Sequence, residues 1–138
     1  MISVNNLAGH KVSAVFLKKV AKIVLSGENI EKEKELSVVL VKPATIKKLN
    51  QKYRKKNQPT DVLSFEGDIK FGILGEVVIC PQEVKKNAGK NKTVEKKELA
   101  FVLIHGILHL LGYCHEGSGK EAKIMDKKTK NYLLKVNL

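Results

Sequence analysis

The sequence has few cysteines, few aromatic residues and no long apolar run. Two cysteines are too few for the disulfide framework of a small secreted domain, so we expect a cytosolic protein. No apolar segment approaches the roughly 20 residues that a membrane-spanning helix needs. Residues 1–9 lack the pattern of a signal peptide. Tryptophan is absent and aromatic residues make up 5% of the chain, which leaves few side chains for stacking on nucleic-acid bases.

Basic residues are abundant by contrast. Lysine and arginine number 26 against 14 acidic residues, a formal net charge of +12. Such an excess favours a polyanionic partner, nucleic acid before a membrane surface, although lysine enrichment from genomic composition would produce the same count. Of the basic residues only Arg54 is an arginine. A chain that keeps a single arginine can need a planar, bidentate donor at that place.

Length and hydropathy pattern predict one domain, residues 1–138, with its own core and without repeats. Alternation and apolar runs predict strands at residues 2–7, 36–41, 62–65 and 73–80, the last two joined by a turn over 67–72. Helical spacing predicts five helices: residues 12–27, one beginning at Pro43, a short one beginning at Pro81 that fades into a loop over 87–92, one capped by Thr93 that runs to Leu111, and one from Ser118 to about Leu134. The order β-α-β-α-β-β-α-α-α predicts an α+β fold, a mixed sheet of about four strands covered by helices.

Three of the four histidines lie within eleven residues, 105–115. His105 and His109 are four residues apart on the predicted helix, so their rings project from one face and can bind one ion. Gly112 lets the chain leave the helix and turn back, which would deliver His115 as a third ligand. The flanking segment is apolar, and an unpaired buried ring would cost about 1–3 kcal/mol. We therefore predict a zincin-like three-His site that holds one zinc ion per chain and leaves its fourth position open, as catalytic zinc sites do. His10 stands apart, as a core histidine with a hydrogen bond or a surface one.

The spacing of these histidines is also that of the metzincin proteases, with one difference. Those enzymes carry a glutamate directly after the first histidine, and it deprotonates the attacking water. Here that position is Gly106. A peptidase built this way would lack its general base, which disfavours peptide hydrolysis.

A second polar stretch, residues 50–65, contains Arg54 with Lys52, Lys55 and Lys56 around it, followed by a Pro-Thr-Asp turn. A guanidinium offers two parallel donors that match phosphate oxygens, whereas ammonium groups act as point charges. The alternative is an ordinary helix C-terminus, where cations are favoured by the helix dipole. The residues alone leave both interpretations open.

Both stretches resemble the YbeY family, bacterial endoribonucleases described as rRNA maturation factors. The family's histidine motif is present as HGILHLLGYCH at residues 105–115. Its second motif is present as Asn50, Tyr53, Arg54 and PTDVLSF at residues 59–65, and a third as LGEV at residues 74–77. The resemblance covers nearly the whole chain. One position departs: Cys114 stands where the family usually has aspartate, which puts in doubt a carboxylate that orients a ligand imidazole. A thiolate there could compete as a soft zinc ligand, but we favour a small buried side chain.

The resemblance implies a mixed four-stranded sheet with helices, a histidine-rich zinc site and cleavage of single-stranded RNA. It also implies a role at the 3′ end of small-subunit rRNA and in ribosome quality control, with rRNA and the small ribosomal subunit or assembly factors as partners, in the cytoplasm and without a membrane. We assign zinc binding to His105, His109 and His115, catalysis to Arg54 and His105, and RNA binding to Lys52, Arg54, Lys55 and Lys56. No general acid is visible, so attack by zinc-activated hydroxide and by the RNA 2′-OH both stay open. The alternatives are a non-catalytic assembly factor stabilised by zinc and a hydrolase of another substrate.

Overall fold

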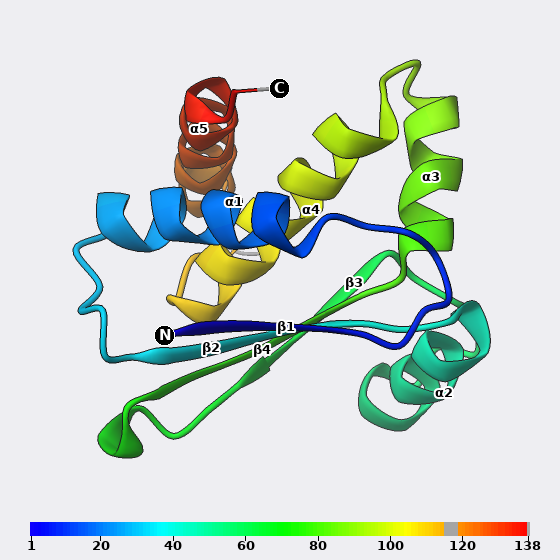
Figure 1. Ribbon diagram of the computed structural model, residues 1–138, viewed down its shortest axis with the longest axis horizontal. Helices are drawn as coiled ribbons and strands as arrows, with labels where there is room; N and C mark the ends of the chain where they lie inside the picture. The colour runs from blue at the N-terminus through cyan, green and yellow to red at the C-terminus, as the bar shows by residue number, and fades with distance from the viewer. Residues whose placement is uncertain (115–118, 138) are drawn as a thin grey trace.

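A computed structural model describes residues 1–114 and 119–137 and shows a four-stranded sheet with helices on both faces (Figure 1). One helix, α2, covers one face. Helices α1 and α4 cover the other, and α3 and α5 pack against α4. The elements are β1 Ile2–Asn6, α1 Ala14–Gly27, β2 Glu35–Leu40, α2 Pro43–Arg54, β3 Val62–Glu66, a 3-10 turn Ile69–Phe71, β4 Ile73–Ile79, α3 Pro81–Lys90, α4 Glu95–Leu110 and α5 Gly119–Lys135. No helix within the described ranges is long and apolar enough to cross a membrane.

The strand order in the sheet is β1-β2-β4-β3. β1 pairs with β2 and β2 with β4 in parallel, whereas β3 pairs with β4 antiparallel through the turn that contains the 3-10 residues. The predicted mixed sheet and the predicted order of elements are both confirmed. β1 and β3 form the two edges of the sheet, and this position of β3 decides how the candidate site is built.

Successive side chains of the central strands point to opposite faces of the sheet, so each face has its own hydrophobic core. Val38 of β2 and Val77 of β4 are fully buried and face the layer that contains α1 and α4. Their neighbours Val39 and Val78 face α2, where Ile46 is fully buried. β2, which was predicted as a strand at residues 36–41, is therefore covered by helices on both faces.

Two boundaries around residues 87–95 differ from the prediction. Helix α3 does not fade at residue 87 but continues to Lys90, because Ala88, one turn after Val84, is buried in the core. Thr93 does not cap the next helix. Val94 is the N-cap residue of α4 and makes no side-chain cap, while the Thr93 amide donates to the Ala88 carbonyl at 3.0 Å. The threonine therefore belongs to the end of α3.

A buried carboxylate joins three helices. Glu28, directly after α1 and 8% exposed, accepts hydrogen bonds from the hydroxyls of Tyr113 (2.5 Å) and Tyr132 and from Lys128 Nζ (3.0 Å). Burial works toward a higher pKa for Glu28, but the hydrogen bonds from Tyr113, Tyr132 and Lys128 outweigh it and hold the pKa below the ordinary 4.5. Burial, together with the bond to Glu28, raises the pKa of Tyr132 to about 12. The carboxylate therefore links α1 to α5 and to the residue that follows the end of α4.

The substitution E28Q should lower the free energy of unfolding at neutral pH by about 1–3 kcal/mol, because an amide cannot accept these bonds as a charged group. The loss should shrink in acid. A carboxyl with a lowered folded-state pKa contributes stability above its unfolded pKa and loses it as pH falls through the folded value, here below 4.5. Denaturant unfolding at neutral and acidic pH measures both effects. The control is E33Q, since Glu33 is exposed on the connector. An equal loss in both variants at neutral pH would contradict the network.

Candidate functional site

His105 and His109 lie one turn apart on α4, as their spacing predicts. The two side chains differ in exposure: His105 is half-buried and His109, in the last turn, is exposed. The His105 ring stacks on Phe101 one turn earlier, with ring centroids 6.0 Å apart and planes inclined by 22°. The helix around them is buried over most of its surface, including fully buried Leu103 and Ile107. The two imidazoles are therefore presented from the most deeply packed helix of the fold.

Gly106, between the two histidines, is where α4 contacts the sheet most closely. A Cβ added at this glycine would lie 2.8 Å from Val77 Cγ1 and 3.2 Å from Ser64 Oγ. The Ser64 hydroxyl donates to the Gly106 carbonyl at 3.0 Å. The absence of a side chain at residue 106 thus lets the backbone of α4 approach β3 and β4. A glutamate, which metzincins carry there, would not fit against this sheet.

The end of α4 turns sharply away from the helix axis. Gly112 has φ +98°, a conformation that disfavours a side chain. Its amide donates to the His109 carbonyl at 3.1 Å, and the Tyr113 amide donates to Leu108 at 3.1 Å. The predicted stop at Gly112 is confirmed. His115 lies outside the described residues, and within residues 1–114 and 119–137 no three His, Cys, Asp or Glu side chains form a group suited to a metal. The three-His site stays a prediction, with two of its members placed.

The basic half of the predicted site lies at the C-terminal end of α2. Arg54 is the last residue of that helix and is exposed, as are Lys52, Lys55 and Lys56. Lys55 caps the helix in the left-handed conformation, with φ 58°. Buried Asn50 donates to the Gln58 carbonyl at 2.9 Å and so attaches the following loop to the helix. The four cations are therefore gathered at one helix end, which agrees with both interpretations of this stretch.

Strand β3 lies between the two halves. Phe65 faces α2, where its ring meets that of Tyr53 edge-on with centroids 5.0 Å apart. Ser64, the preceding residue, faces the opposite side and bonds to Gly106 of α4. Because successive side chains of a strand point to opposite faces, the histidines and Arg54 flank this edge strand from its two sides. Any ligand that contacts both halves must pass around the outer edge of β3.

The fold and these motifs place the chain among known proteins. A sequence profile described as endoribonuclease YbeY matches residues 4–137. This chain belongs to the YbeY family. The endoribonuclease YbeY of Persephonella marina is 42% identical over 124 residues, which are 86% of this chain and 80% of that protein. That of Pelotomaculum thermopropionicum is 42% identical over 130 residues, 88% of this chain and 85% of that one.

A solution structure from Thermotoga maritima matches with a TM-score of 0.68 at 38% identity. The match covers 96% of this chain and 88% of that one. The resemblance to the YbeY family that the motifs predicted is confirmed, and the four-stranded α+β fold agrees with it.

Two further sequence predictions have an outcome in the structure. Cys114, where the YbeY family usually has aspartate, is not a buried filler but half-exposed, because it follows the turn at Gly112 that takes the chain off the helix. His10 is half-buried and its Nε2 lies 2.7 Å from Glu95 Oε1, so it is a histidine with a satisfied hydrogen bond, as expected.

Two contacts that shape the candidate site were not predicted from the sequence. Ser64 was treated only as part of a motif, yet its hydroxyl fixes β3 to α4. Glu28 was assigned no role from the sequence, yet its carboxylate accepts a hydrogen bond from Tyr113 at the C-terminal end of α1. One signal that could have pointed to this contact is the tyrosine in the histidine motif, because a tyrosine hydroxyl usually needs a hydrogen-bond partner where it is buried. No periodicity, however, connects residues 28 and 113.

The substitution G106A should lower the free energy of unfolding by about 1–3 kcal/mol, the usual cost of an overpacked contact. Alanine favours the helix by about 1 kcal/mol over glycine, but its methyl group would lie too close to Val77 and Ser64. Thermal and denaturant unfolding measure the difference. The matched control is G89A on α3, where an added Cβ meets nothing within 4 Å and should not destabilise. Equal stability of the two variants would refute the close-approach role of Gly106.

Proposed function

We propose that this protein is a zinc-dependent endoribonuclease that cleaves single-stranded RNA and acts in maturation of the small-subunit rRNA 3′ end. One observation carries the proposal. The His105 and His109 pair of the family motif lies on a helix that is bonded to β3 through Gly106, and the end of α2, which carries the only arginine of the sequence, contacts the other face of β3 through Tyr53 and Phe65. The YbeY family membership over residues 4–137 supports RNA as the substrate. The proposal extends to ribosome quality control, to the small subunit or assembly factors as partners, and to the cytoplasm, which the resemblance implies.

The donor set fits zinc. Imidazole nitrogens are ligands that suit zinc, and two of them four residues apart on one helix can reach one ion. His105 and His109 supply this pair, and His115 would complete it. When bound, zinc would supply Lewis acidity that lowers the pKa of water at the scissile phosphate. Burial of the surrounding helix keeps the two rings on a rigid element, which limits the loss of order on binding.

Arg54 has the chemistry to bind the phosphate whose bond is cleaved. Its guanidinium can donate two hydrogen bonds to the non-bridging oxygens, where negative charge grows in the transition state. No acid within residues 1–114 and 119–137 forms an ion pair with Arg54, so none of the described carboxylates takes up its donors. Lys52, Lys55 and Lys56 would hold neighbouring phosphates without reading bases. The RNA strand would thus cross the outer edge of β3, with its backbone held on the α2 side and the reacting phosphate between Arg54 and the histidines.

Zinc content and RNA cleavage test this function together. Wild-type protein should bind close to one zinc per chain and cleave single-stranded RNA, and removal of the metal should abolish cleavage reversibly. H105A and H109A should each weaken zinc binding by more than about 100-fold, since even the loss of an outer-shell partner costs 10–100-fold. The control is H10A, because His10 is paired with Glu95 away from α4's histidines. Zinc content by atomic emission and cleavage of labelled RNA are the two measurements.

Two outcomes would overturn the proposal. RNA that is bound but never cleaved, with or without zinc, would indicate the non-catalytic assembly factor. Cleavage of unfolded protein in preference to RNA would indicate a hydrolase of another substrate.

The substitution R54K keeps the charge but replaces a rigid bidentate donor by a mobile ammonium. Zinc binding should stay unchanged, because no ligand is altered, and RNA affinity should change little. kcat should fall about 10²–10³-fold, the usual loss when one preorganised donor to a developing oxyanion is removed. Single-turnover cleavage and equilibrium binding separate the two effects. A K56R variant controls for the exchange of lysine and arginine at this helix end. Wild-type turnover in R54K would show that Arg54 only ends the helix.

A further inference from the structure

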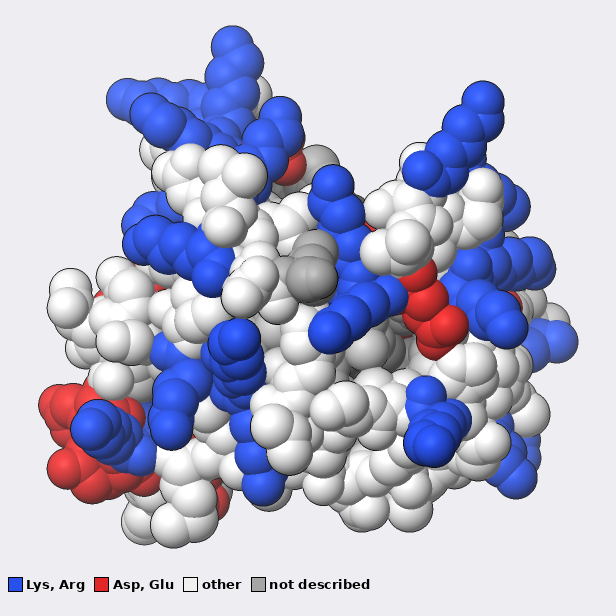
Figure 2. Space-filling view, turned by 45° about the horizontal axis from the view of Figure 1, so that its top comes forward, with Lys and Arg blue, Asp and Glu red and all other residues white. Residues whose placement is uncertain are grey.

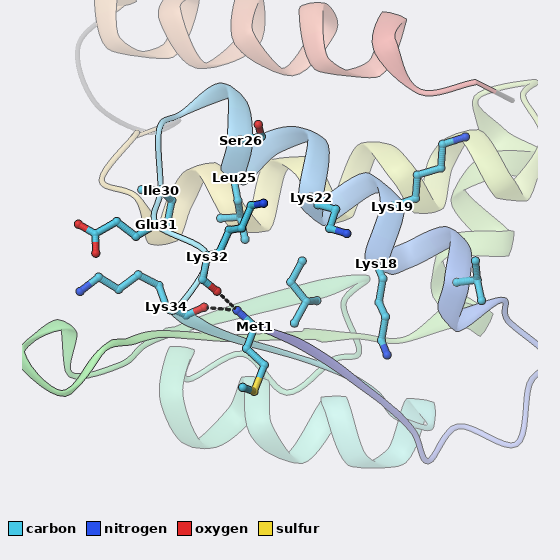
Figure 3. A pocket seen from close by; sticks show the side chains of 12 residues that line it. Met1, Lys18, Lys19, Lys22, Leu25, Ser26, Ile30, Glu31, Lys32 and Lys34 are labelled. Carbon is cyan, nitrogen blue, oxygen red and sulfur yellow. Dashed lines mark hydrogen bonds between the residues drawn. The ribbon is translucent and has the colours of Figure 1, made fainter.

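A large groove lies between α1 and the β1 edge of the sheet, and none of the described histidines lines it. Its volume is about 890 Å³. The floor is apolar, with Ile2, Leu25 and Ile30 among its residues, while lysines of α1 and of the connector before β2 line its walls (Figure 3). β1 is the edge strand opposite to β3, so this groove and the candidate catalytic site belong to opposite edges of the sheet. The function proposed above does not use it.

A second, smaller hollow of about 420 Å³ lies on the side of α1 toward α5. Both hollows are lined in part by Lys19, Lys22 and Ser26 of α1, so they adjoin along that helix. We call the two hollows together the α1 track. Six lysines line it: Lys18, Lys19, Lys22, Lys32, Lys34 and Lys135.

The α1 track is strongly basic. Among the described residues that line it, Glu31 is the only acid. None of its lysines takes part in the ion pairs formed by described residues, which join His10 to Glu95 and Lys128 to Glu28. Figure 2 shows basic side chains over much of the drawn face and acidic side chains gathered in separate patches, with a large one at the lower left. Six ammonium groups against one carboxylate in these two hollows favour a polyanion as the ligand.

We propose that the α1 track is a second binding site for the RNA substrate, which holds the strand at a distance from the bond that is cleaved. This inference rests on the function proposed above. Two adjoining hollows lined by cations match a chain that carries one negative charge per nucleotide. No aromatic side chain lines the described part of the track, so binding there depends on the phosphates and not on the identity of the bases. The site adds affinity for RNA that extends well beyond the cleaved bond.

An acidic protein segment is the competing occupant. Both hollows have apolar residues in their linings, but their lysines come from α1, from the segment before β2 and from α5, so the positive charge is spread over both of them. A strand with one charge on every nucleotide can meet cations in both hollows, whereas an acidic protein segment would have to carry its charges at matching positions.

The test compares two single-stranded RNAs that share one cleavage site, one just long enough to cross the β3 edge and one several times longer. The triple variant K18A/K19A/K22A removes three charges from the centre of the track, and alanine preserves the helix. It should weaken binding of the long RNA about tenfold at low salt. It should also reduce the slope of log K against log salt by about 2, since each phosphate contact to a single strand contributes about 0.7. Binding and cleavage of the short RNA should stay unchanged.

The matched control is K123A/K127A/K130A, which removes the same charge from exposed lysines of α5 that do not line the track. Binding is also measured in the H109A background, where RNA is not cleaved. Failure of the cleavage proposal therefore leaves the binding result readable. A synthetic polyglutamate peptide is titrated alongside the RNAs.

A loss of long-RNA affinity confined to the α1 variant supports the second site. Equal losses in both triple variants would overturn it, because a general field of net charge would then account for the binding. No loss in either variant would also overturn it. Polyglutamate binding that depends on Lys18, Lys19 and Lys22, with RNA binding unaffected, would assign the track to an acidic protein partner instead.

Discussion

The burial of α4 against the sheet is the contact on which the rest of the structure depends. This helix packs against α1, α3 and α5 as well as β3 and β4, and its side chains are buried on nearly every face. It contributes fully buried Leu103, Ile104, Ile107 and Leu108 to the larger core. Hydrophobic burial of that size fixes the position and rotation of the helix. The backbone positions of the two histidines are therefore fixed, because they lie on a helix that has little freedom to rotate.

Close packing here also restricts the chemistry. Gly106 lets the helix backbone reach Ser64 and Val77, and the same contact excludes the glutamate that a metzincin protease would place there. The departure from the protease motif is therefore a packing requirement of this fold. The residue that follows His105 in the sequence is therefore a glycine and not a carboxylate. In the function that we propose, Arg54 supplies the charge stabilisation from the other side of the edge strand.

Glu28 extends this constraint to the end of the histidine motif. Residues 28, 113, 128 and 132 come from the end of α1, the turn after α4 and two turns of α5. A carboxylate with a lowered pKa holds two tyrosines and a lysine at one point beneath the surface. The packing of the helical layer and the course of the chain after His109 are thereby coupled. A change in the packing of the helices would therefore alter the course of the chain after His109, and the effect needs no contact with a substrate.

The sequence by itself determined the elements, their order and the two motifs, because periodicity and turn residues act over a few positions. It predicted α4 and its stop at Gly112, though not its N-cap residue, and it placed His105 and His109 one turn apart on that helix. It failed where a distant contact decides: α3 continues to Lys90 because Ala88 finds the core, and Cys114 is half-exposed because the chain leaves the helix beside it. Only the tertiary structure decided that the histidines and Arg54 lie on opposite sides of one edge strand, and that lysines far apart in sequence line one track. Strand order and helix packing set these relations, and they follow from burial of the whole chain at once and not from local pattern.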